Sequence, residues 1–213
     1  TWEDLAQDEL PKSVYYAFVG AAPERSKSSS PSWLVSIDYQ VTDDLLAYVS
    51  HRGSWRTGGF NWNVFPTQTS GNIGGNVFLP EKTKDIEIGM KYQGNELGVP
   101  ARLEVDFYNQ WVDNIQRADY FVNPLNATVN LFSINVPQAQ TTGAELAGSI
   151  KPTPWLTFGL SGAYTNARFT KATTTVAVGG TSILTTFGPM ADAPKWTGSV
   201  YFDITHEMDG NLG

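Results

Sequence analysis

The feature that most limits how this chain can fold is an alternation of apolar and polar residues with a period of two. In the stretch LVSIDYQV, Val35 and Ile37 fall on one face of an extended strand, and Ser36 and Asp38 fall on the other. The same alternation recurs along the chain and predicts about seven antiparallel strands. The segments that carry it are 33–41, 45–52, 85–92, 102–108, 144–151, 156–161 and 196–205.

The connections between these segments are alternately short and long, which predicts an up-and-down meander. The short ones contain Asp, Gly, Asn and Pro, residues that suit tight turns. Long structureless loops are uncommon in compact soluble domains, whereas bacterial outer-membrane barrels have short periplasmic turns and long extracellular loops. The short connections are 41–45, 93–100 and 151–155, and the long ones are 53–80, 117–135 and 169–192.

The composition of the two strand faces favours a membrane barrel over a soluble sandwich. Only 16% of the residues are charged, against about 25% in an average protein. The polar faces carry Ser, Thr, Gly, Gln and Tyr with charges of both signs, as expected for a watery lumen. Aromatic residues near strand ends fit the interfacial girdles of such a barrel. They are Trp33, Tyr39, Tyr92, Trp111, Trp155 and Trp196.

Several classes of function are disfavoured by what the sequence lacks. The net charge of −7, with scattered Lys and Arg, argues against nucleic-acid binding, and the absence of cysteine excludes disulfides and thiolate chemistry. No apolar run is long enough for a transmembrane helix, and no leader opens the chain, so we expect a mature protein or a piece of a longer one. No catalytic or phosphate-binding motif is present. His51 and His206 lie far apart in sequence, so we expect no enzyme activity, no metal and no cofactor.

Five blocks of sequence go beyond pattern and resemble the barrel of TonB-dependent outer-membrane receptors. The first two are YVSHRGSWRTGGFN and FLPEKTKDIEIGMKY, in which a Gly-Gly-Phe-Asn stretch precedes Pro-Glu and Glu-Ile-Gly. The other three are VDFYNQWVDNIQ, TTGAELAGSIKPTPWLTFGLSGAYTNARF and DAPKWTGSV, and they follow in the order that the family shows. The resemblance covers about residues 33–205.

The resemblance implies a transmembrane β-barrel section: about seven strands of a barrel that has about 22 in this family. Residues 1–32 would be an extracellular loop, 33–205 the barrel strands and loops, and 206–213 a periplasmic turn. The plug domain of the family is absent from this chain. The location implied is the bacterial outer membrane, with outer-membrane lipid around the barrel.

The function implied is energy-coupled uptake of a scarce nutrient, with a ferric siderophore as the expected ligand. The implied partners are the receptor's own plug domain and, through it, the inner-membrane TonB complex. Polar residues that face inward would hold the plug and line a water-filled channel. The residues expected there are Glu87, Arg102, Glu104 and Glu145.

Aromatic and guanidinium side chains near the outside suit recognition of a siderophore, glycan or aromatic nutrient by stacking and charge-assisted hydrogen bonds. Each of these residues could instead belong to the aromatic girdle at the level of the lipid headgroups, or hold the loops together. The candidates are Trp55, Arg56, Phe60, Trp62, Arg117, Tyr120 and Phe121.

Two other functions stay open at this point, and so does the orientation of one strand. The chain could belong to a passive porin-like channel, or to a secreted soluble β-sandwich that binds carbohydrate. A two-residue turn at Asp43 and Asp44 would set Tyr39 opposite Tyr48, whereas a three-residue turn would send Leu45, Ala47 and Val49 to the lipid. One residue of register reverses the faces of segment 45–52.

Overall fold

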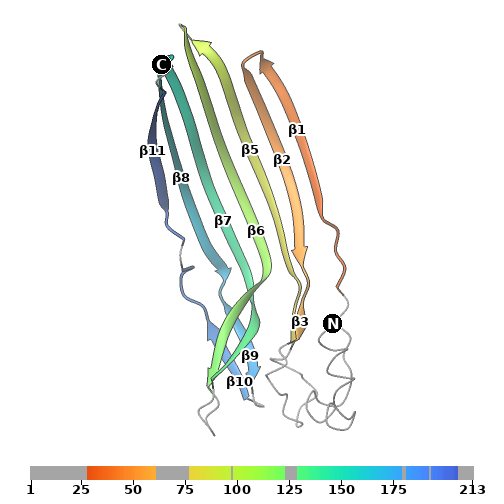
Figure 1. Cartoon of the computed structure of the whole chain (residues 1–213). Helices are drawn as coiled ribbons and strands as arrows, with labels where there is room; N and C mark the ends of the chain where they lie inside the picture. The colour runs from red at the N-terminus through yellow and green to blue at the C-terminus, as the bar shows by residue number, and fades with distance from the viewer. Residues whose placement is uncertain are drawn as a thin grey trace, which may run out of the picture.

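The computed structural model describes residues 28–60, 77–96, 98–122, 129–178, 181–191 and 193–205. Seven strands form one antiparallel sheet in the order β1-β2-β5-β6-β7-β8-β11, so the sheet is an up-and-down meander (Figure 1). The strands are β1 (Trp33–Thr42), β2 (Leu45–Arg56), β5 (Glu81–Glu96), β6 (Val99–Val122), β7 (Val129–Thr153), β8 (Leu156–Lys171) and β11 (Trp196–Ile204).

Short connections lie at one end of the sheet and long ones at the other. Asp43 and Asp44 join β1 to β2, Pro154 and Trp155 join β7 to β8, and Gly98 lies between β5 and β6. Gly98 has a φ of 83°, a left-handed conformation that suits glycine in a tight turn. We call this end, at the top of Figure 1, the short-turn end, and the opposite end the loop end.

A bulge decides the orientation of β2. Tyr39 pairs with Ala47 and Ile37 pairs with Val49, because the register shifts between Gln40 and Thr42. The turn itself has two residues, but Val41 is extra on the β1 side. Leu45, Ala47 and Val49 therefore share the apolar face of β1, which is the second of the two arrangements that the sequence left open.

The apolar face of the sheet is uncovered in the part of the chain that the structure describes. The side chains of Ile37, Ile88 and Phe107 are 66%, 58% and 55% exposed. Alternation continues across β2 and β5 without a register shift, so these residues share one face. A soluble sandwich would bury this face against a second layer, and the described residues form no such layer.

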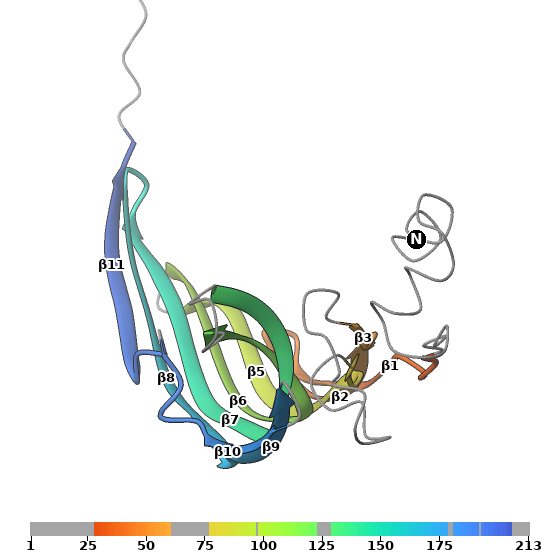
Figure 2. The ribbon, with the colours of Figure 1, turned by 90° about the horizontal axis from the view of Figure 1, so that it is seen from below.

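The opposite face is concave and polar. Seen along the strands, the sheet curves into a trough (Figure 2). A hollow of about 550 Å³ on it is lined by Glu104, Asp106 and Glu145, among others. We call this the inner face and the apolar side the outer face.

Strands β6 and β7 are longer than the sequence pattern predicts. They contain 24 and 25 residues, whereas a membrane-crossing strand needs about 9–11. Much of the connection expected at 117–135 is thus paired strand, since Arg117 pairs with Ile134 and Tyr120 with Leu131. We call residues 115–122 and 129–136 the β6–β7 arm.

The connection expected at 169–192 is also partly paired. It contains β9 (Thr173–Val178) and β10 (Thr181–Thr186), which form a two-stranded sheet. The remaining pair, β3 (Gly59–Phe60) and β4 (Val77–Phe78), flanks residues 61–76. Paired backbone satisfies the hydrogen-bonding groups that a structureless loop would expose.

Candidate functional site

A row of inner-face residues crosses β2, β5 and β6 and carries the main polar contacts of the wall. Tyr48 pairs with Gly89, and Gly89 pairs with Asp106. Because Gly89 has no side chain, the ring of Tyr48 lies over it and its hydroxyl reaches Asp106 two strands away. The same hydroxyl donates to Glu87 at 3.0 Å. One tyrosine thus joins three strands.

Ion pairs link the same strands along the inner face. Arg52 Nε lies 2.9 Å from Asp85 Oδ1, and its Nη2 lies 2.6 Å from Glu87 Oε2. Lys91 pairs with Glu104, and its Nζ lies 5.5 Å from the centre of the Tyr48 ring. These side chains are partly exposed to water, so the pairs contribute more to orientation than to stability.

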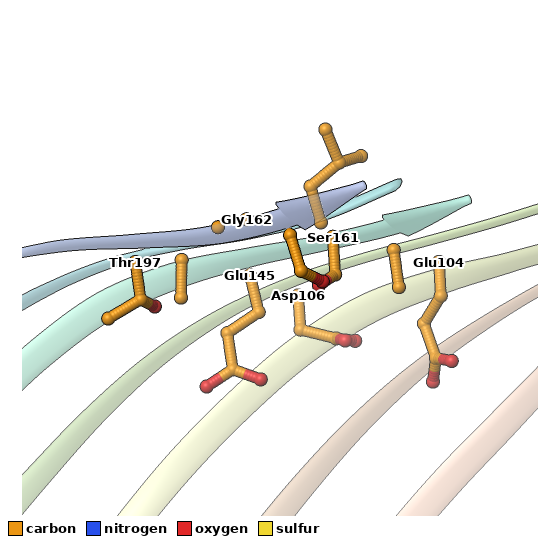
Figure 3. A pocket seen from close by; sticks show the side chains of 11 residues that line it. Glu104, Asp106, Glu145, Ser161, Gly162 and Thr197 are labelled. Carbon is orange, nitrogen blue, oxygen red and sulfur yellow. The ribbon is translucent and has the colours of Figure 1, made fainter. Parts of the chain in front are cut away.

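The four polar residues expected in the lumen all lie on the inner face. Glu87 and Glu104 are ion-paired, as described above. Arg102 and Glu145 form no ion pair with any described residue, although Arg102 pairs through its backbone with Gln93 and Ser149. Figure 3 shows the side chains of Glu104, Asp106 and Glu145 extending to the same side of the sheet. The charged residues that line the hollow are therefore all acidic.

The expected ligand residues divide between the two faces. Arg56 is on the inner face, where its Nη2 lies 2.8 Å from Glu81 Oε2. Trp55 is on the outer face, opposite Lys82. Tyr120, in the β6–β7 arm, is 70% exposed. Trp62 and the side chains of Phe60 and Phe121 lie outside the part of the chain that the structure describes.

Arg117 lies beside the aromatic ring of Phe169 at the loop end. Its guanidinium carbon is 5.8 Å from the centre of the Phe169 ring, a cation–π distance. Phe169 in turn lies 6.0 Å from Phe187. Phe169 pairs with Ala139, which belongs to the inner-face row of Val112. The cation and the rings therefore lie on the inner side of the wall.

Glu81 connects the end of β2, which carries Arg56, to the arm that carries Arg117. Its Oε2 accepts from Arg56 and also from the backbone N–H of Gln116, at 2.7 Å. The side-chain amide of Gln116 donates to the carbonyls of Thr57 and Leu79. The ends of β2 and β5 are thereby joined to the start of the β6–β7 arm.

Asn135 makes a second connection at the same place. It donates to the carbonyls of Leu79 and Asn114, at 3.0 and 2.8 Å, and accepts from the Leu79 N–H at 2.6 Å. Asn114 has a φ of 55°, in the left-handed region, and lies across from Pro137, which has no N–H to give to the ladder. The strand bends there, and Asn135 holds the bend.

A small apolar core supports this bend. The buried apolar side chains of the described residues are Val112, Ile134, Val136 and Ala139, all on β6 and β7. Sequence reasoning missed Glu81, Gln116 and Asn135 as positioning residues. The second and third family blocks contain Glu81 and Gln116, but polar residues near a long connection look alike without the fold.

No group of three or more metal-ligating side chains occurs among the described residues. His51 lies on the outer face, 5.9 Å from Trp33 between ring centres, and His206 lies outside the described part. The structure also shows, over the residues it describes, no helix with the length and apolarity to cross a membrane.

A curved wall with an apolar outer face and a polar inner face defines a section of an outer-membrane barrel, and comparison with known proteins gives the family. The family model for the TonB dependent receptor-like β-barrel matches residues 8–211. The chain therefore belongs to the TonB-dependent receptor family, whose members are transporters of the bacterial outer membrane rather than enzymes. The resemblance found in the sequence is confirmed, and the soluble sandwich is set aside.

Two solved structures of outer-membrane proteins have a similar fold over part of their length. The ferric yersiniabactin uptake receptor FyuA from Yersinia pestis is similar with a TM-score of 0.56 and 18% identity, over 83% of this chain and 23% of FyuA. The copper transporter OprC is similar with a TM-score of 0.51 and 21% identity, over 66% of this chain and 21% of OprC. The chain thus spans less than a quarter of either protein. No curated protein matches the sequence.

Proposed function

We propose that this chain is a section of the wall of a receptor that takes up a ferric siderophore by energy-coupled transport. The observation that carries the proposal is the junction at the loop end, where Glu81 joins Arg56 to the arm that bears Arg117. In this proposal the loop end faces the outside, so the junction lies at the entrance of the barrel.

The chemistry of the junction supports an anionic, aromatic ligand. A guanidinium group donates charge-assisted hydrogen bonds to oxygen anions, and aromatic rings stack on flat ligand groups. Arg117 and Phe169 supply both in one place, and Tyr120 extends farther out along the arm. Arg56 is neutralised by Glu81, so we assign it a positioning role. Trp55, on the outer face, belongs to the girdle in this proposal.

The inner face supports passage and plug contact. Glu104, Asp106 and Glu145 offer hydrogen-bond acceptors to a plug or to water in the bore, and Arg102 offers donors without a competing ion pair. The receptor's own plug domain, pulled by the inner-membrane TonB complex, would open the path. FyuA is by name an uptake receptor for a ferric siderophore, which agrees with the ligand class proposed here.

The ligand site is tested by binding of a ferric siderophore to the purified full-length receptor. Arg117→Gln should weaken binding about tenfold or more, because a charge-assisted contact of about 1.5–3 kcal/mol is lost. Lys151→Gln removes the same charge at the short-turn end and should bind like the wild type. Equal affinity of all three proteins would refute the assignment of Arg117.

Energy coupling is tested in cells grown under iron limitation. Accumulation of radioactive iron from its siderophore should stop when the inner-membrane energy-coupling complex is deleted. Undiminished accumulation in that strain would instead support the passive porin-like channel. Growth rescue by copper or a sugar rather than by a ferric siderophore would overturn the nutrient class.

A further inference from the structure

The inner face of the wall is divided into a charged part and an uncharged part. Within the described ranges, every ion pair joins β2, β5 and β6, as Arg52 does with Asp85 and Glu87. The residues that β8 and β11 contribute to the hollow carry no charge. Two of them, Ser161 and Ser199, share a hydrogen bond of 2.8 Å between their hydroxyl groups. The inner face thus changes in character between β6 and β8.

Small side chains continue along the inner face of β8 from the loop end toward the short-turn end. Phe169 stands at the loop end of this row, and the ring of Tyr201 lies over Gly159 at its other end. The ten residue steps from Phe169 to Gly159 cover about 33 Å of extended strand. The inner side chains between them are no larger than threonine. We call these four residues the β8 track: Ala167, Thr165, Ala163 and Ser161.

The β8 track connects the proposed ligand contact to the hollow. At the loop end, the guanidinium carbon of Arg117 lies 5.8 Å from the centre of the Phe169 ring. Farther along β8, Ala163 and Ser161 line the hollow beside Glu145 of β7 (Figure 3). The volume of the hollow, about 550 Å³, is within the range of pockets that hold small molecules. The track thus leads from Arg117 to a space large enough for a small ligand.

The chemistry of the β8 track suits passage rather than tight binding. Conduction requires contacts that are weak enough for the ligand to leave. Serine and threonine hydroxyls form neutral hydrogen bonds that water can replace, and the Tyr108 hydroxyl adds another, 3.1 Å from Thr165 Oγ1. The carboxylates of Glu145 and Asp106 beside the track repel an anion, so they do not retain an anionic ligand. Passage among β2, β5 and β6 would instead require their ion pairs to separate.

We propose that the ferric siderophore passes through the bore along the β8 track, between the plug and strands β7, β8 and β11. The plug keeps its contacts with the charged part of the inner face, on β2, β5 and β6.

This proposal rests on the function proposed above, because the ligand and its point of entry are taken from there. It adds the part of the wall that lines the path. The two can fail separately, since siderophore uptake by the wild type tests the function, and variants of the track test the path. If the plug itself packs closely against the small side chains of the track, no path runs there.

The test measures siderophore binding and iron uptake separately in cells that carry the full-length receptor. Ala163→Trp places a large ring in the middle of the track and should slow uptake of radioactive iron from a ferric siderophore about tenfold, the effect of about 1.4 kcal/mol on a barrier. The affinity for the siderophore should not change, because Arg117 and Phe169 are intact. Ala163→Leu should slow uptake less, and Ala163→Ser should take up iron like the wild type.

Ser36→Trp is the matched control, because it places the same ring on the inner face of β1. Ser36 is exposed and belongs to the cross-strand row of Thr165, at the other edge of the described sheet from β8 and β11. Uptake by this variant should equal that of the wild type. Folding of every variant is verified by its heat-dependent shift in gel mobility, and Ala163→Leu carries the comparison if Ala163→Trp does not fold.

Three results would overturn the assignment of the path. They are wild-type uptake by Ala163→Trp and Ala163→Leu, an equal loss of uptake in Ser36→Trp, and passive entry of a large antibiotic through Ala163→Trp. The last would show that the plug packs on the track and has been displaced. Failure of the wild type to take up any ferric siderophore would instead refute the proposed function itself.

Discussion

At the scale of the residue, tyrosine covers glycine across neighbouring strands of the inner face. In each case the tyrosine ring occupies the space that a Cβ added to the glycine would need. The pair thus packs the concave surface where strands curve toward one another. A flat ring over a bare backbone also excludes water from the ladder beneath it. The pairs are Tyr48 with Gly89, Tyr108 with Gly143, and Tyr201 with Gly159.

We predict that Gly143→Ala destabilises the receptor by about 1–3 kcal/mol, since overpacking in a filled site forces neighbours to shift. An added Cβ would lie 2.5 Å from the carbonyl oxygen of Tyr164, which is backbone and cannot move aside easily, and would also meet the ring of Tyr108. Unfolding of the full-length receptor in detergent, followed by gel mobility against temperature, measures the loss.

Gly162→Ala is the matched control for this substitution. Its Cβ would meet only the carbonyl oxygen of Thr197, at 3.7 Å, which is ordinary contact. We expect a change within about 0.5 kcal/mol. If both alanine variants unfold together with the wild type, the tyrosine–glycine packing does not stabilise the wall.

At the scale of the element, the β6–β7 arm is a long hairpin whose direction is set where it leaves the sheet. In the function proposed above, Arg117 and Tyr120 contact the ligand, and a fixed direction of the arm would hold them in place. Asn114 provides the bend, and Asn135 and Gln116 attach it to the end of β5. Figure 1 shows β6 and β7 continuing together toward the loop end, beyond the end of β2.

We predict that Asn135→Leu loosens the arm without unfolding the sheet. The substitution keeps the size of the side chain but removes its three hydrogen bonds, to groups of Leu79 and Asn114. Neutral hydrogen bonds of this kind contribute about 0.5–1.5 kcal/mol each. Hydrogen exchange should therefore become faster over residues 115–122 while the amides of β8 stay protected.

Asn166→Leu serves as the control, because Asn166 lies on the outer face of β8 and no side-chain hydrogen bond is described for it. Exchange in the arm should not change in this variant. Unaltered exchange in Asn135→Leu as well would show that the apolar core around Val136 fixes the arm without the asparagine.

At the scale of the whole molecule, the two faces of the wall contact different solvents. The outer face contacts hydrocarbon and the inner face contacts water, so the side chains of adjacent residues in one strand lie in different environments. The two edges of the described sheet, β1 and β11, have unpaired backbone groups on one side. In a complete receptor further strands pair with them and close the barrel.

We predict opposite outcomes for lysine at two successive positions of β7. Leu146→Lys places a charge in hydrocarbon and should cost about 2–4 kcal/mol near the middle of the bilayer. Ala147→Lys places it on the inner face opposite Glu104, where the acidic hollow offers partners, and should fold normally. Folding of the full-length receptor into lipid vesicles, scored by gel mobility, distinguishes them. Equal folding of both variants would contradict the assignment of the faces.

The sequence by itself determined the seven strands of the main sheet, the faces of all of them except β2, and the family. Side chains alternate strictly along an extended backbone, so the order of residues alone places Ile37, Ile88 and Phe107 on one face. The polar set of Glu87, Arg102, Glu104 and Glu145 followed from the same rule. Five local blocks in a fixed order were enough to indicate the receptor family.

Only the tertiary structure decided what depends on pairing between distant segments. The bulge at Val41 reversed the faces of β2 relative to a simple two-residue turn, because one extra residue shifts every later pair. The contacts of Glu81 with Arg56 and Gln116 join positions separated by 25 and 35 residues. Local pattern records the period of a strand but not its partner. The wall was therefore predictable, and the junction at its loop end was not.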